Sequence, residues 1–136
     1  MVRGARYAYL ALAWVFLAGV VLQVFFIGLA LFVGSENFAL HRDFGYILQL
    51  VPLAVLIAAF VARAGRTRIL QTASLLAVIV VFPTLPLFRD SVPVLAAFHP
   101  IGALLGFWLG IVVMRGATTL LREPDPRAAS TASVPA

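Results

Sequence analysis

The sequence predicts an all-α fold, a bundle of four transmembrane helices that run up-down-up-down. Three observations predict it: the composition, a set of long apolar runs, and the positions of the arginines. Of the 136 residues, 63% are hydrophobic and only 11% are charged. A soluble domain of this size needs a polar shell, so this composition indicates that lipid is the solvent.

Four apolar runs have close to the ~20 residues that a helix needs to cross a bilayer. They cover residues 8–33, 44–62, 69–88 and 91–114. Lipid cannot bond backbone groups, so each run must be a helix or part of a closed barrel. The runs are continuous rather than alternating, which favours helices. The first run is longer than the apolar region of a signal peptide, and we interpret it as a retained anchor.

The basic residues set the predicted orientation, and all of them are arginines. The side with more arginines faces the cytoplasm in most membrane proteins. We therefore predict a multi-pass protein of the bacterial inner membrane with both termini in the cytoplasm. We interpret the charges as contacts with anionic lipid rather than with nucleic acid. The predicted cytoplasmic side carries Arg3, Arg6, Arg63, Arg66, Arg68, Arg115, Arg122 and Arg127, and the outer side carries Arg42 and Arg89.

The predicted division of the chain is simple. Residues 1–122 form the transmembrane domain, and residues 123–136, rich in Pro, Ala and Ser, form a disordered cytoplasmic tail. The connections are short, so consecutive helices should be antiparallel neighbours. Prolines inside the spans predict kinks, with the third helix bent near its outer end. These prolines are Pro52, Pro83, Pro86 and Pro100.

His41 and His99 are the only histidines, and the predicted topology places both toward the outer side. The second and fourth helices thus each begin near a histidine, a hint of a duplicated hairpin. At ~1.5 Å per residue, His99 should lie roughly 9 Å deeper than His41. An ionisable group within lipid is costly and suggests function. The alternatives are an interfacial polar residue for His41 and, for His99, a helix-start residue that bonds a backbone carbonyl.

Two imidazoles on separate helices suit the axial ligation of one haem b. The predicted depth difference is tolerable for ligands on opposite faces of a large cofactor, and too large for a small ion unless the helices tilt. Gly45 follows His41 at i+4, while Gly102 and Gly106 follow His99 on one helical stripe. These glycines leave room for a flat macrocycle, or equally for another helix.

Further candidates lie near the same predicted surface. Arg42 and Arg89 could pair with the propionate carboxylates of such a haem. Tyr46 could add a hydrogen bond there. The spans contain no acidic residue, and we find no motif for phosphate binding, nucleophilic catalysis or metalloprotease chemistry. The sequence therefore favours an electron-transfer or accessory subunit over a stand-alone enzyme, and predicts no catalytic residue.

The segments 41–46 (His-Arg-Asp-Phe-Gly-Tyr) and 98–102 (Phe-His-Pro-Ile-Gly) resemble small bacterial four-helix membrane proteins of uncharacterised function. Their layout is similar to the bis-histidine membrane b-type cytochromes, and to one half of haem A synthase. That half carries a glutamate shortly before a His-Arg pair. Here Glu36 precedes His41 with one residue more than that spacing. The resemblance implies that His41 and His99 are axial ligands of one haem b.

The leading interpretation is a b-type cytochrome module with one haem between the second and fourth helices near the outer face. It would exchange single electrons with a quinol or another membrane redox protein. The main alternative is a cofactor-free accessory subunit that docks on a larger membrane complex, alone or as a homo- or hetero-oligomer. Its docking surfaces would be the glycine stripe and the aromatic first helix. A minimal transporter or channel is less favoured, because the spans offer only scattered amides and hydroxyls.

Overall fold

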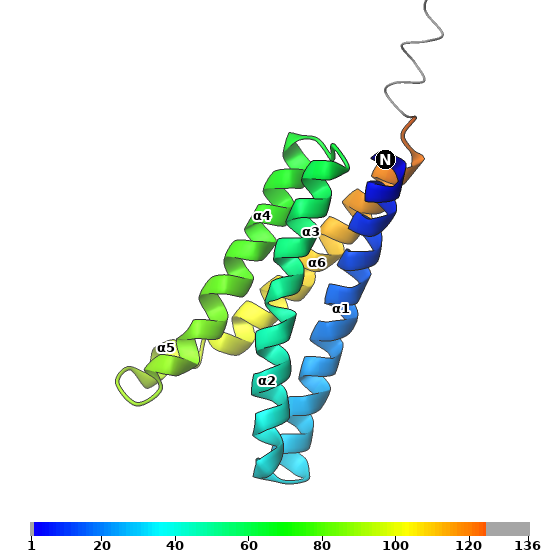
Figure 1. Ribbon diagram of the computed structural model, residues 1–136. Coiled ribbons are helices and arrows are strands. Elements are labelled where there is room, and N and C mark those ends of the chain that lie inside the picture. Colours follow the sequence, from blue (N-terminus) through cyan, green and yellow to red (C-terminus); the bar gives the residue numbers. More distant parts are fainter. Residues whose placement is uncertain (1, 125–136) are drawn as a thin grey trace, which may run out of the picture.

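A computed structural model describes residues 2–124, and within this range the chain is all-helical, with four segments long and apolar enough to cross a membrane (Figure 1). This confirms the predicted fold class. Some helices extend beyond the apolar runs, and the predicted tail from residue 125 onward lies outside the described residues. The first segment is α1 (Val2–Phe32). The second segment comprises η1 (Ser35–Asn37), α2 (Phe38–Leu48) and α3 (Leu50–Val61). The third segment comprises α4 (Arg66–Val81) and η2 (Phe82–Phe88). The fourth segment comprises α5 (Pro93–Ala96) and α6 (His99–Arg122).

Prolines explain where the segments are interrupted. Pro52 has no N–H to donate to the carbonyl of Leu48, and the helix breaks at Gln49, between α2 and α3. Pro83 and Pro86 likewise remove two donors, and the end of the third segment tightens into the 3₁₀ helix η2. The third segment therefore leaves α-helical geometry near its outer end, where the prolines lie.

The long helices form a ring in which each packs against its two neighbours. α1 contacts α3 and α6, and α4 contacts the same two helices from the other side. These neighbours confirm the up-down-up-down order. The centre of the ring is filled by fully buried side chains, whereas many large apolar side chains remain exposed, as expected of a surface that faces lipid. The largest buried ones are Tyr9, Phe16, Leu75, Leu120, Val55 and Val113.

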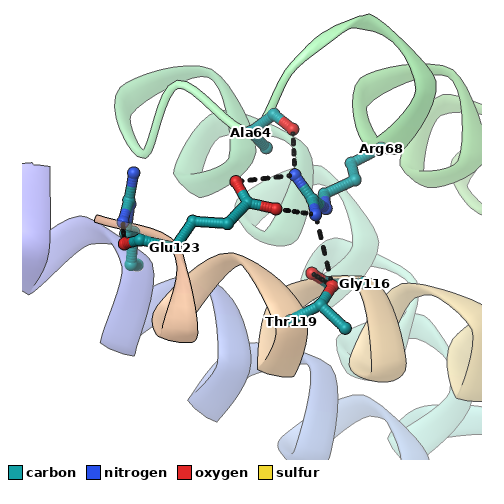
Figure 2. Close-up of polar contacts among 6 residues, drawn as sticks. Ala64, Arg68, Gly116, Thr119 and Glu123 are labelled. Carbon is teal, nitrogen blue, oxygen red and sulfur yellow. Dashed lines mark hydrogen bonds and ion pairs between the residues drawn. The ribbon is translucent and has the colours of Figure 1, made fainter. Parts of the chain in front are cut away.

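The two ends of the described chain meet at one end of the bundle, which we call the arginine-rich end (Figure 1). Arg6 of α1 donates from Nη1 to the backbone oxygen of Glu123 at 2.7 Å. Arg68 of α4 pairs with the carboxylate of Glu123 (Figure 2). Glu123, just after α6, thereby joins three helices at this end.

One buried hydrogen bond inside the bundle allows a direct test of the packing. The Tyr9 hydroxyl lies 3.0 Å from Thr72 Oγ1, which itself donates to the carbonyl of Arg68. Thr72 has only one hydroxyl proton, so Tyr9 must be the donor. We expect Tyr9→Phe to lower the free energy of unfolding by about 1 kcal/mol. Tyr7→Phe, at a position that is 55% exposed, should change it little. Reversible unfolding in mixed detergent measures both, and equal effects would contradict the assigned bond.

Candidate functional site

The structure brings His41 and His99 together. His41 lies in the first turns of α2, and His99 is the first residue of α6. Their ring centroids are 6.3 Å apart and the ring planes are perpendicular, at 90°. Since both lie away from the arginine-rich end, we call this the histidine end.

The rings are closer together than the roughly 9 Å depth difference predicted for the two residues, because side chains extend from the backbone and can bridge such an offset. The predicted difference assumed straight, parallel helices. In the structure α3 already ends at Val61, and Arg63 has a left-handed φ of 52° in the following turn. The second segment is also interrupted at Gln49, so it is not one continuous straight helix.

Each imidazole is fixed by a backbone carbonyl of the preceding long helical segment. His41 Nδ1 lies 3.1 Å from the oxygen of Gln23, and His99 Nδ1 lies 3.2 Å from the oxygen of Phe82. A carbonyl oxygen only accepts, so each Nδ1 carries the proton. In the neutral ring Nε2 then holds the lone pair, and within residues 2–124 no hydrogen bond engages either Nε2. This is the arrangement that commonly orients histidines toward a metal.

The two histidines are held in equivalent ways by two successive hairpins. His41 reaches back 18 residues to Gln23, and His99 reaches back 17 residues to Phe82. The carbonyl of Phe82 lacks its usual α-helical donor because residue 86, four positions on, is a proline. The carbonyl of Gln23 has a second lone pair for His41. The geometry therefore repeats between the two halves of the described chain.

The glycines near the histidines serve helix packing, which was the alternative to a haem slot. A Cβ at Gly45 would lie 2.6 Å from Gln23 Nε2, and one at Gly106 would lie 2.7 Å from Ile79 Cδ1. A Cβ at Gly102 would overlap the side chain of Phe82. Small residues let helices approach closely in membranes, and here the space they leave is filled by side chains of the same chain.

The remaining predicted residues lie at the surface of the histidine end. Arg42 pairs with Asp43 at 2.8 Å, and Arg89 pairs with Asp90 at 3.6 Å. The arginine side chains are 63% and 77% exposed, and Tyr46 is 60% exposed. Within the described range no hydrogen bond or ion pair joins any of these three to the imidazoles. Exposed ion pairs of this kind are weak because water screens them, so either arginine can exchange its carboxylate partner.

His99 is a helix-start residue that bonds a backbone carbonyl, which was the alternative interpretation of this residue. Sequence reasoning did not identify that carbonyl as the one of Phe82, and it missed the carbonyl of Gln23. For Phe82 a signal existed, since Pro86 frees the carbonyl and Pro83 marks the same bend. Gln23 is one of the scattered amides of the spans. Its Oε1 is buried without a hydrogen-bond partner among the described residues. A buried unpaired oxygen is costly, so this amide oxygen can accept a bond from any donor that reaches it.

The histidine end is the least closed part of the bundle. α2 packs on α1 and α3, and η2 packs on α4, α5 and α6, but the described residues show no extensive contact between α2 and α6. Figure 1 shows the two hairpins diverging toward this end. The histidine pair therefore lies where the two hairpins separate.

Comparison with known proteins gives one match. A family described as "Family of unknown function (DUF6220)" matches residues 23–86. No curated protein and no solved structure matches the chain. The match includes Gln23, His41 and Phe82 and ends before His99. It agrees with the predicted likeness to membrane proteins of uncharacterised function, and the comparisons give no support to a likeness to b-type cytochromes or to haem A synthase.

Proposed function

We propose that this protein is a membrane b-type cytochrome module in which His41 and His99 are the axial ligands of one haem b. The observation that carries the proposal is the pair of neighbouring imidazoles, 6.3 Å apart between centroids, each with Nδ1 bonded to a carbonyl. The pair comes from separate hairpins, so a group bound between the rings would join the two halves of the bundle.

The ring separation suits a metal between two nitrogens. A metal held about 2.0 Å from each Nε2 separates the centroids of two opposed imidazoles by roughly 6 Å. His41 and His99 would each offer Nε2 to the iron, and perpendicular ring planes are compatible with this role. The carbonyl bonds to Nδ1 also keep both rings in the tautomer that a metal requires.

The number of ligands favours a macrocycle over a bare ion. Within residues 2–124 no group of three or more His, Asp or Glu side chains is placed to hold a metal. A structural zinc site ordinarily needs four protein ligands. A haem brings four nitrogens of its own and needs only two from the protein. Two histidines are therefore sufficient for haem and insufficient for a structural zinc ion.

Around the imidazoles, Arg42 and Arg89 would hold the propionates, each by releasing its neighbouring aspartate. The side-chain oxygen of Gln23 offers a further buried hydrogen-bond acceptor. When bound, haem would supply one-electron chemistry. By the positive-inside rule the site would face the outer side of the bacterial inner membrane, with both termini cytoplasmic. Since it lies at one end of the bundle, electrons would pass to a quinol or another membrane redox protein.

The cofactor-free accessory subunit is less well supported. Its docking surface would include the glycine stripe of α6, and that stripe is buried inside the chain. Gly102 and Gly106 face Phe82 and Ile79 of the third segment, and Gly110 faces Phe16 and Leu17 of α1. Of the two predicted docking surfaces this leaves the exposed aromatics of α1, such as Trp14 and Phe32, which lipid covers equally well.

Absorption spectroscopy of the purified full-length protein tests the proposal. The protein is expressed with haem available and titrated with haemin if it is isolated without it. We expect a Soret band, about one haem per chain, and a sharpened α band on dithionite reduction. A protein that shows no Soret band and takes up no haemin beyond empty detergent micelles would contradict the proposal.

A further inference from the structure

A second region of interest is a cavity at the arginine-rich end, far from the histidines. It has a volume of about 470 Å³ and lies between the start of α4 and the last turns of α6. Three arginines, two threonines and one glutamine line it, and no acidic residue does. The lining is therefore strongly cationic and rich in hydrogen-bond donors.

Two of these arginines are free to bind a ligand. Arg68 is engaged by the carboxylate of Glu123, by the carbonyl of Ala64 and by Thr119 (Figure 2). Arg66 and Arg115 are exposed, and within residues 2–124 neither makes a hydrogen bond or an ion pair. Two uncommitted guanidiniums lining one cavity form a site for an anion with several oxygens, and a phosphate matches their planar donors and has enough oxygens for both.

The backbone adds donors to the same place. α4 begins at Arg66 after Gly65, and no side chain caps its first turn. The first N–H groups of a helix have no partner within it and carry the positive end of the helix dipole. In this cavity they supplement the arginines rather than define the site.

The surface below the cavity indicates that the phosphate belongs to a lipid. From Arg115 the same face of α6 continues through Val112, which lines the cavity, to Trp108, which is 59% exposed. This face runs from the charged end into the apolar span. A lipid whose phosphate is bound by the arginines would thus place its acyl chain along this face of α6. Free phosphate has no apolar part that could contact this face.

We propose that this cavity binds the phosphate of an anionic phospholipid, with Arg66 and Arg115 as its charged ligands. Arg68 keeps Glu123 and shapes the wall of the cavity. The site is more specific than a general attraction of arginines to anionic lipid, because only the arginines that line the cavity contribute. It is independent of the histidine pair.

Lipid binding by the full-length protein in nanodiscs tests this. The discs contain phosphatidylcholine with increasing phosphatidylglycerol, and native mass spectrometry counts the phosphatidylglycerol that the protein retains. We expect Arg66→Gln and Arg115→Gln each to weaken retention about fivefold. Arg122→Gln removes the same charge at the same end without lining the cavity, and should retain lipid like the wild type.

Two results would overturn the proposal. Equal losses in all three variants would show a non-specific charge effect. Displacement of phosphatidylglycerol by millimolar inorganic phosphate, together with phosphate binding in pure phosphatidylcholine discs, would assign the cavity to a soluble anion. Both variant positions are exposed and unbonded in the described structure, so misfolding is not expected to obscure the result.

Discussion

His99→Ala and His41→Ala are each expected to abolish stable haem binding, with loss of the Soret band from the purified protein. Each imidazole supplies one of only two protein ligands, and its Nδ1 is already anchored to a carbonyl. Loss of one ligand leaves a single bond from one hairpin, and nothing then holds the metal between the hairpins. We expect the affinity for haemin to fall at least about 100-fold. Loss of a residue that only supports a metal ligand lowers metal affinity by about 10- to 100-fold, and loss of the ligand itself should cost more.

The control for both variants is Gln49→Ala, which removes a half-buried polar side chain from the junction between α2 and α3. This variant should keep the wild-type spectrum. Loss of the band in all three variants would indicate general unfolding. An unchanged spectrum in both histidine variants would contradict the assigned ligands, and impaired assembly without any spectrum would favour the accessory-subunit alternative.

Gly102→Ala is expected to destabilise the protein by about 1–3 kcal/mol, the usual cost of overpacking. The added methyl would overlap Cβ and Cγ of Phe82. Because Phe82 Cβ is attached directly to the backbone, rotation of the side chain cannot relieve the overlap, and α6 must move away from η2. That movement also stretches the bond between His99 and the carbonyl of Phe82, so haem affinity should fall together with stability.

Gly28→Ala is the matched control, because a Cβ at Gly28 in α1 meets nothing within 4 Å. Here alanine should be neutral or stabilise the helix by up to about 1 kcal/mol. Reversible unfolding in mixed detergent and haemin titration, applied to both variants, separate the two outcomes. Equal stability of Gly102→Ala and Gly28→Ala would show that α6 and η2 are not packed as described.

The fold was predictable because it depends on composition, which lipid constrains strongly. Four apolar runs with few breaks can hardly form anything but helices, and Pro83 and Pro86 mark the place where α4 gives way to the 3₁₀ helix η2. The approach of His41 and His99 followed from topology, since both lie toward the same predicted side. Their exact separation could not be predicted, because helix tilt and the break at Gln49 depend on packing.

The immediate surroundings of the histidines were predictable only in part. Backbone carbonyls belong to every residue, so no sequence pattern singles out Gln23 as an acceptor. From the sequence, the glycines were consistent with a cofactor slot or with helix packing. Which of the two is right depends on whether side chains of the preceding segment fill the space beside each glycine. Gln23 and Phe82 do so at Gly45 and Gly102, which sequence spacing alone could not show.

Electron paramagnetic resonance of the ferric, haem-loaded protein tests the central claim most directly, because it reports the axial ligands and their relative orientation. Two neutral imidazoles predict a low-spin ferric signal, and ring planes at 90° predict a strongly anisotropic one. The signal should convert to high-spin in any residual haem-bound His41→Ala or His99→Ala protein. A high-spin signal from the wild type, or a low-spin signal that survives both substitutions, would contradict ligation of haem by these histidines.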